Sequence, residues 1–363
     1  MLVTDLINVR YLSGFTGSAA ALLVYADDRP TVLATDGRYR TQAARQAPDL
    51  HVVIDRNGPA HLVSQAAAAG MKRIGFEAHV VTVEGFDALS AVLKRPPKAL
   101  GTTDTDLAIH WVRPSRLVES LREVKDAGEV ALLRLACEAA DAALTDLIAR
   151  GGIRPGRTER EVARDLEALM LDHGADAASF ETIVAAGANS AIPHHRPTSA
   201  VLATGDFVKV DFGALVAGYH SDMTRTFVLG TPADWQREIY QVAEAAQRAG
   251  RHAARPGVAL RDVDAAARTV IDQAGYGETF GHGLGHGVGL RIHEAPGINA
   301  AADGTLLAGA VVTIEPGVYL ADRGGVRIED TLVVGDMPAD GTSAPAGTHQ
   351  ELLTRFPKEL TIL

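Results

Sequence analysis

The chain has 363 residues, of which 47% are hydrophobic and 22% charged, enough to bury one large core or two ordinary ones. Its formal charge of -10, from 45 acidic and 35 basic residues, argues against nucleic acid or an anionic membrane as partner, because both favour basic patches. A single cysteine, Cys137, excludes an intrachain disulfide, and the absence of a signal-peptide pattern and of any apolar run near about 18 residues predicts a cytoplasmic protein without a membrane span.

From residue 2 to about residue 110, short apolar runs alternate with helical stretches, which is the pattern of an α/β layer. Strands are predicted at 22–25, 31–35, 51–54 and 73–76, and helices near 37–47, 59–70 and 84–94. The stretch 94–106 predicts a loop, since its prolines end the preceding helix. We place the domain boundary in the charged stretch around residue 120, so that the predicted domains are 1–120 and 121–363.

A long helix opens the second domain, with apolar residues at alternating steps of three and four over 130–147 and Gly151-Gly152 at its end. Cys137 lies on its apolar face, which predicts a buried thiol. Another helix follows, where Thr158 and Glu161 form a capping-box pattern. Further strands are predicted at 182–187, 206–216 and 220–230, then helices at about 234–249 and 260–274, then strands at 309–320 and 324–335.

The two halves of this second domain match each other in sequence. The run that contains Asp211 aligns with the run that contains Glu315 at an offset of 104 (315 minus 211). Asp222 and Glu329 align in the same way at an offset of 107 (329 minus 222). The repeat predicts a pseudo-twofold α+β sheet domain with a site at its centre.

Residues 281–294, GHGLGHGVGLRIHE, carry three histidines and one glutamate on a backbone rich in glycine. The stretch is too glycine-rich for a helix and too polar for a core strand, which indicates a site. It does not fit the G-x-G-x-x-G dinucleotide fingerprint, because another residue fills the place of the third glycine in every register. It does not fit the HExxH zinc motif either, because His293-Glu294 is followed by Ala-Pro-Gly. If His286 binds a metal, its partners come from elsewhere.

Four carboxylates supply the expected partners: Asp211, Asp222, Glu315 and Glu329. Each interrupts an apolar β-like run, where a carboxylate is costly unless it is exposed, paired or bound to a metal. Any one alone could lie on the wet face of a half-exposed sheet. Four that converge would raise one another's pKa unless cations neutralised them, so with His286 they predict two divalent ions and the equipment to hydrolyse an amide bond. Oxygen-rich ligation with one imidazole suits manganese foremost, or cobalt or zinc.

Five motifs in this order resemble the pita-bread metallopeptidases, in the branch of Xaa-Pro aminopeptidases (aminopeptidase P) and Xaa-Pro dipeptidases (prolidases): VDFGA (210–214), SDMTRT (221–226), GHGVGLRIHE (285–294), IEPGVY (314–319) and VRIED (326–330). The runs at 8–18 and 35–39 are similar to the family's creatinase-like N-terminal domain, and FPKEL (356–360) to its C-terminal end. The resemblance implies an α/β creatinase-like domain at 1–120 and an α+β pita-bread catalytic domain at 121–363. Relatives usually carry one more helix before the first strand, so either this chain is shortened or its N-terminal domain is smaller.

The resemblance also implies the role of each ligand. The five metal ligands would be Asp211, Asp222, His286, Glu315 and Glu329. Asp222 and Glu329 would bridge the two ions, and Glu315 would also be the general base.

Four further residues receive roles from the resemblance. His194 and His293 would contact the substrate carbonyl and steady the tetrahedral intermediate. His282 would help to shape the proline pocket, and Arg327 would orient a ligand. His194 is preferred to the adjacent His195 because it directly follows a proline, as in the family pattern. His293 could instead be a packed structural histidine.

The implied reaction is hydrolysis of the bond between an N-terminal residue and a following proline, by a homodimer or homotetramer. Some dipeptidase relatives place an arginine after the proline of the H-E-x-P segment, where this chain has Gly297. The absence of that carboxylate clamp favours an aminopeptidase that accepts longer peptides over a dipeptidase. A methionine aminopeptidase is disfavoured by the additional N-terminal 120 residues, and a metal-free scaffold or creatinase-like relative by the presence of every ligand.

Overall fold

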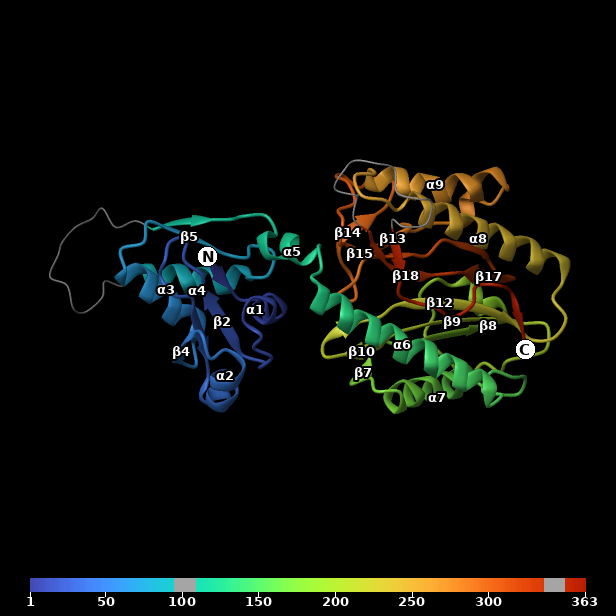
Figure 1. Cartoon of the computed structure of the whole chain (residues 1–363), viewed down its shortest axis with the longest axis horizontal. Helices are drawn as coiled ribbons and strands as arrows, with labels where there is room; N and C mark the ends of the chain where they lie inside the picture. The colour runs from blue at the N-terminus through green and yellow to red at the C-terminus, as the bar shows by residue number, and fades with distance from the viewer. Residues whose placement is uncertain (95–108, 336–349) are drawn as a thin grey trace. The chain divides into compact units, whose positions relative to one another are not determined.

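The computed structural model describes residues 1–94, 109–335 and 350–363, so the loop predicted at 94–106 lies, after its first residue, outside the described residues. The chain forms two compact units, Met1–Leu121 and Arg122–Leu363, which divide inside the short helix α5 (Leu117–Arg122) (Figure 1). Within the described ranges, none of the helices combines the length and the apolar character that crossing a bilayer requires.

The first unit is an α/β layer built on a four-stranded sheet in the order β1-β2-β3-β4. Successive residues of a strand face opposite sides, so Leu22 and Leu33 pack with helices α1 and α2 while Ala21 and Ala34 pack with α3 and α4. The elements are β1 (Leu2–Val3), α1 (Leu6–Ser13), β2 (Ala20–Leu23), β3 (Val32–Thr35), η1 (Gly37–Tyr39), α2 (Arg40–Gln46), β4 (His51–Ile54), α3 (Gly58–Ala68), β5 (Arg73–Gly75), α4 (Val83–Leu93) and β6 (His110–Val112). The predicted strands and helices of this unit are confirmed to within two residues.

The second unit consists of two halves, each of which begins with two helices and continues through strands that include a hairpin. The first half contains α6 (Ala127–Ala149), α7 (Glu159–Asp172), β7 (Ala177–Ala178), β8 (Ile183–Ala186), η2 (Gly187–Ala191), β9 (Phe207–Phe212), β10 (Ala214–Val216), β11 (Tyr219–His220) and β12 (Met223–Val228). The second half contains α8 (Asp234–Ala253), α9 (Leu260–Gln273), η3 (Gly277–Thr279), β13 (Gly285–Gly287), β14 (Glu294–Ile298), β15 (Val311–Ile314), β16 (Gly317–Leu320), β17 (Gly324–Arg327), β18 (Asp330–Val334), β19 (Gln350–Leu352) and β20 (Thr361–Ile362).

The sheets of the two halves correspond strand by strand. One contains β12-β9-β8 as neighbours and the other β18-β15-β13. A two-stranded hairpin interrupts each half at the same point, with β10 and β11 between β9 and β12, and β16 and β17 between β15 and β18. The pseudo-twofold repeat predicted from the sequence offsets is therefore confirmed.

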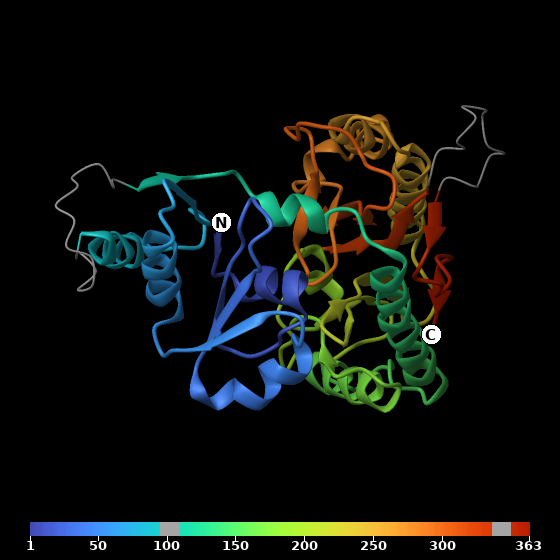
Figure 2. The ribbon, with the colours of Figure 1, turned by 60° about the vertical axis from the view of Figure 1, so that its left-hand side comes forward.

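The helices cover the paired sheets from two sides. Figures 1 and 2 both show α8 and α9 on one side and α6 and α7 on the other, and each pair packs with its own sheet in a separate apolar core. Helix α6 carries the buried Cys137, as predicted, and burial raises the pKa of its thiol. The predicted capping box is present at the start of α7, where Thr158 and Glu161 bond each other's backbone amides.

The strands predicted at 206–216, 220–230, 309–320 and 324–335 are not continuous, and this corrects the sequence interpretation. The first breaks at Gly213, where a Cβ atom would lie 1.8 Å from the carbonyl oxygen of Ser221. The other three break at Asp222, Glu315 and Glu329, each in the short gap between two strands. These three carboxylates therefore lie between strands, where the backbone does not have to follow the alternation of a strand and their side chains can point toward a common centre.

Candidate metal centre

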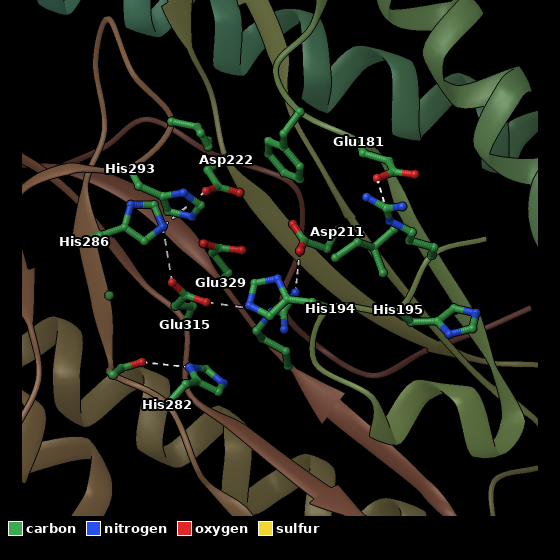
Figure 3. Close-up of a pocket in the computed structure, with 17 residues that line it drawn as sticks. Glu181, His194, His195, Asp211, Asp222, His282, His286, His293, Glu315 and Glu329 are labelled. Carbon is green, nitrogen blue, oxygen red and sulfur yellow. Dashed lines mark hydrogen bonds and ion pairs between the residues drawn. The ribbon is translucent and has the colours of Figure 1, made fainter. Parts of the chain in front are cut away.

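The carboxylates come together because equivalent strand ends meet. Asp211 is the penultimate residue of β9, and Asp222 directly precedes its antiparallel neighbour β12. Glu315 directly follows β15, and Glu329 directly precedes the antiparallel β18. In an antiparallel pair the end of one strand lies beside the start of the next. Each half thus presents two carboxylates at one end of its sheet, and all four line a single pocket (Figure 3).

His286 completes this group from β13, the strand beside β15. Its Nδ1 lies 3.0 Å from the carbonyl oxygen of Gly287, which can only accept, so Nδ1 carries the proton and Nε2 keeps a free lone pair. That Nε2 lies 3.5 Å from Asp222 Oδ2 and 3.4 Å from Glu315 Oε1. Ligand atoms of Asp222, His286 and Glu329 all lie within 4.8 Å of one another. This donor set suits a divalent cation.

The strand that carries His286 corrects one prediction, since the stretch 281–294 was expected to be too polar for a core strand. Residues Gly285–Gly287 form a strand because their glycines permit very close contacts. A Cβ atom on Gly285 would lie 2.0 Å from the carbonyl oxygen of Thr313, and one on Gly287 would lie 2.0 Å from that of Ala295. The missing side chains therefore let this strand press between its neighbours and project His286 into the pocket.

The carboxylates of the pocket have raised pKa values, as expected for a buried anionic cluster with too few cations to neutralise it. Burial, and then the charge of Glu329, raise the pKa of Asp222 well above its ordinary value. Burial and Glu315 do the same to the pKa of Glu329. Burial raises the pKa of Glu315 to about 7 and lowers the pKa of His286 to about 4, so the imidazole is neutral at pH 7. Divalent cations would relieve this repulsion, and the residues therefore fit a metal centre.

Arg327 holds two of the carboxylates. Its Nη2 donates to Asp211 Oδ2, while the buried Oδ1 of Asp211 has no hydrogen-bond partner among the described residues. An orphaned buried oxygen is costly unless it meets a cation, which fits a ligand role. Arg327 Nε also donates to Thr224 Oγ1 at 2.9 Å, and that hydroxyl donates in turn to Glu329 Oε2 at 2.6 Å. Arg327 thus orients Asp211 directly and Glu329 through Thr224.

The pocket has a volume of about 430 Å³, within the range of small-ligand sites. Its walls include all five predicted ligands together with His194, His282, His293 and Arg327. Apolar surface is supplied by Phe180, Ile183 and Ile292. Every site residue predicted from the sequence is therefore brought to one cavity.

The histidines of the pocket differ in their surroundings. The ring of His293 packs edge-on against His286 with 4.4 Å between the centroids, and burial lowers its pKa. His282 Nε2 lies 2.9 Å from the hydroxyl of Tyr319, and burial lowers the pKa of His282 to about 4. Figure 3 shows His194 near Glu315 and Asp211 and His195 farther from them. His195 Nε2 donates to Oε2 of Glu159, the first residue of α7, at 2.8 Å. Both histidines line the pocket, and the role of His194 as the one that contacts the substrate stays a prediction.

Lys209 is a residue of this region that the sequence did not single out. It is fully buried on β9, and its Nζ donates to the carbonyl oxygen of Ile192 at 2.6 Å and to that of Pro193 at 3.3 Å. The same ammonium lies 5.1 Å from the ring centroid of Tyr319. Burial lowers the pKa of Lys209. The available signal was a lysine between the apolar residues Val208 and Val210 of β9, and its contacts fix the backbone directly before His194.

Glu159 holds the same segment from the other side. It lies at the first turn of α7 with no exposed surface, and its two oxygens accept five hydrogen bonds of 2.7 to 2.9 Å. The donors are the amide of Ala186, the side chains of Asn189 and His195, and both the amide and the hydroxyl of Thr198. In the sequence this residue looks like an ordinary acidic residue at a helix start. The residues on both sides of His194 are therefore anchored to one buried carboxylate.

Two similar sheet halves bring their acidic residues together around one imidazole, which is the pita-bread arrangement with a donor set that fits metal. Comparison with known families agrees with this assignment. Residues 131–336 match the model of metallopeptidase family M24, and residues 1–124 match that of the creatinase/prolidase N-terminal domain. The chain belongs to metallopeptidase family M24, and the resemblance and the fold predicted from its motifs are confirmed.

Solved structures of relatives cover the whole chain. A Xaa-Pro dipeptidase from Bacillus anthracis has a solved structure with a TM-score of 0.88 and 37% identity, covering 100% of this chain and 94% of that one. The structure of an X-Pro aminopeptidase from Thermotoga maritima gives a TM-score of 0.85 and 31% identity, covering 100% and 97%. A Xaa-Pro dipeptidase from Pyrococcus furiosus is 43% identical over 65% of this chain and 67% of its own length.

Proposed function

We propose that this protein hydrolyses the peptide bond between an N-terminal residue and a following proline, using two divalent ions. The observation that carries the proposal is the convergence of the ligand set in one pocket with four further histidines. The ligands are Asp211, Asp222, His286, Glu315 and Glu329. The printed names of the relatives, Xaa-Pro dipeptidase and X-Pro aminopeptidase, support the same bond.

The residues of the pocket divide the chemical work. When bound, the ions would act as Lewis acids toward the scissile carbonyl and would lower the pKa of a water so that it can give up a proton and act as the nucleophile. Glu315 takes the proton of the attacking water and passes it to the proline nitrogen as the bond breaks. His194 and His293 donate hydrogen bonds to the carbonyl oxygen as it gains negative charge. His282, fixed by Tyr319, forms part of the wall that receives the proline ring.

Substrate length distinguishes two candidate activities. The prediction of an aminopeptidase rests on glycine at position 297, where some dipeptidase relatives carry arginine. Gly297 lies on β14 and lines a separate groove with Pro296 and Asn299, and the main pocket does not include it. Gly297 therefore lies outside the cavity that contains the predicted ligands. The dipeptidase relatives favour the second candidate, an enzyme restricted to Xaa-Pro dipeptides.

Reconstitution with metal tests both points. The purified protein is stripped with a chelator, reloaded with manganese, cobalt or zinc, and assayed on Ala-Pro, Ala-Pro-Ala and Ala-Pro-Ala-Ala. The proposal expects no hydrolysis without metal and release of alanine after reloading. Hydrolysis of none of these peptides by any reloaded form would refute it. Cleavage of Ala-Pro with the longer peptides intact would assign the dipeptidase activity and contradict the aminopeptidase.

Several finer features belong to the same proposal. Manganese is the expected ion, and a metal analysis of protein purified without added metal tests it. The expected assembly is a homodimer or homotetramer, which sedimentation equilibrium measures. A cytoplasmic location and a domain boundary at residue 120 complete the proposal, and cell fractionation and limited proteolysis test them.

A further inference from the structure

The pocket includes an ion pair that the proposed chemistry does not use. Arg196 Nε lies 3.0 Å from Glu181 Oε2, and both residues line the pocket. Their side chains are 82% and 62% exposed, whereas Asp222 and Glu329 are buried. Figure 3 shows Glu181 with its ion pair on the side of the pocket away from His286. The pair therefore stands at the mouth, where a bound ligand would meet solvent.

A second guanidinium lines the pocket, but its nitrogens are already engaged. Arg327 donates from Nε to Thr224, from Nη1 to Tyr319 and from Nη2 to Asp211. Among the lining residues in the described part of the chain, Arg196 is thus the remaining permanent cation. Its pairing with Glu181 is exposed, and exposed ion pairs contribute little to stability, so exchanging one carboxylate for another costs little. The two Nη groups can meet a carboxylate in a bidentate arrangement.

The charge of the substrate decides which end of the pocket it can use. A Xaa-Pro dipeptide carries a free carboxylate directly on the proline. With two divalent ions bound, the four carboxylates of the buried centre balance the charge of the ions, so the centre offers a fifth carboxylate no excess of positive charge. When the scissile carbonyl of a dipeptide lies at the centre, its carboxylate is therefore more favourably placed at the mouth of the pocket. A longer peptide or an amide has no charge at that position.

The geometry points to Arg196 as the residue that binds the C-terminal carboxylate of a Xaa-Pro dipeptide, with Glu181 as the competing anion. This inference rests on the proposed Xaa-Pro hydrolysis. It makes Arg196 a specificity-determining residue that favours dipeptides over longer chains. The role belongs to the loop that carries His194, and Gly297 has no part in it.

The experiment compares Ala-Pro with Ala-Pro-amide, which differ only in the terminal charge, on the manganese-loaded enzyme. Arg196→Ala should lower the ratio of kcat/KM for the acid to that for the amide about tenfold, mainly through KM of the acid, which is the usual effect of losing one charge-assisted contact. Glu181→Gln should raise the same ratio, because it removes the competitor. Arg150→Ala is the matched control: Arg150 is an exposed arginine paired with Asp146 at 3.1 Å outside this pocket.

The outcomes separate this inference from the proposed function. If Arg196→Ala and Glu181→Gln move the ratio in opposite directions while Arg150→Ala leaves it unchanged, the inference is supported. If the wild type hydrolyses both substrates but the two pocket variants leave the ratio where it was, Arg196 does not bind the carboxylate, although the proposed function stands. If the wild type hydrolyses neither substrate, the proposed function fails and the inference fails with it.

Discussion

Replacing Glu159 with glutamine should loosen the segment that carries His194. Oε2 of Glu159 accepts three hydrogen bonds from His195 and Thr198, and Oε1 accepts two from Ala186 and Asn189. Glutamine keeps the shape but turns one oxygen into an NH2 group, which faces two or three donors in either orientation. Breaking a buried charged contact in this way costs about 3–5 kcal/mol of unfolding free energy.

Urea unfolding and amide hydrogen exchange measure the effect. The amides of Ala186 and Thr198, which donate directly to Glu159, should lose protection first. Activity should fall about tenfold, mostly in kcat, because a displaced His194 weakens the transition state more than substrate binding. The control is Glu161→Gln in the same turn of α7, where the carboxylate is more exposed and the expected loss is below about 1 kcal/mol. Equal urea midpoints for Glu159→Gln and wild type would refute the reasoning.

Acid should reveal the same contact. Burial alone would raise the pKa of Glu159, but hydrogen bonds from Asn189 and His195 outweigh it and hold that pKa below the ordinary value of 4.5. A carboxyl whose pKa is lower in the folded state stabilises the fold above about pH 4.5 and loses that contribution as the pH falls through the folded pKa. Wild type should therefore lose stability below about pH 4.5 more steeply than Glu159→Gln. Parallel losses in the two proteins would count against this account.

Further predictions concern the centre and its histidines. In the metal-free protein Glu315 has a pKa of about 7, against an ordinary value of 4.5, so the folded state holds a proton that the unfolded state releases. The free energy of unfolding should therefore fall by about 3 kcal/mol as the pH rises from about 4.5 to about 7, which urea unfolding measures. A flat profile in the metal-free protein would contradict this. His194→Ala should lower kcat about a hundredfold without changing the melting temperature. His195→Ala should instead lower the free energy of unfolding by about 1–3 kcal/mol with a smaller effect on kcat. The reverse ranking would exchange the roles of the two histidines. Lys209→Met should keep the melting temperature near that of wild type, because methionine fills the buried site, yet reduce kcat; an unchanged kcat would show that the bonds to Ile192 and Pro193 do not position His194.

The carboxylates that meet in the pocket could be predicted because each is marked by its own stretch of sequence. A carboxylate inside an apolar run, repeated at nearly equal offsets, identifies Asp211, Asp222, Glu315 and Glu329 without knowledge of the fold. The register between the strands could not be obtained in this way. Phe212 pairs with Met223, but the residue equivalent to Met223, Asp330, pairs with Ile314.

That register shift has a simple consequence. By the offsets of 104 and 107, the equivalent of Phe212 is residue 316, which lies two residues beyond Ile314. A shift of two residues keeps every side chain on its original face of the sheet. The two halves can therefore differ in register and in hairpin length and still direct their carboxylates toward the same pocket.

The residues that position the site, Glu159 and Lys209, could not be predicted from the sequence because their partners lie far away along the chain. Glu159 reaches Thr198 across 39 positions, and Lys209 reaches Ile192 across 17. Neither separation follows a helix or strand period, and both partners sit in an irregular segment. A charged residue with no exposed surface signals such a role only after the fold has defined the interior.

The C-terminal motif FPKEL, matched at first only as a family resemblance, acquires a physical role in the fold. Arg225 Nη1 donates to the carbonyl oxygen of Glu329 at 2.5 Å, and its Nη2 donates to Asp330 at 2.9 Å and to the carbonyl oxygen of Phe356 at 2.6 Å. Lys358 Nζ adds an ion pair to Asp330 at 3.0 Å. Burial would raise the pKa of Asp330, but Arg225 and Lys358 outweigh it and keep that pKa low. The C-terminal segment and Arg225 thus hold the backbone at Glu329 and Asp330 in place. The Glu329 carboxylate, which lies among other carboxylates, is therefore positioned by cations that contact its backbone and not its side chain.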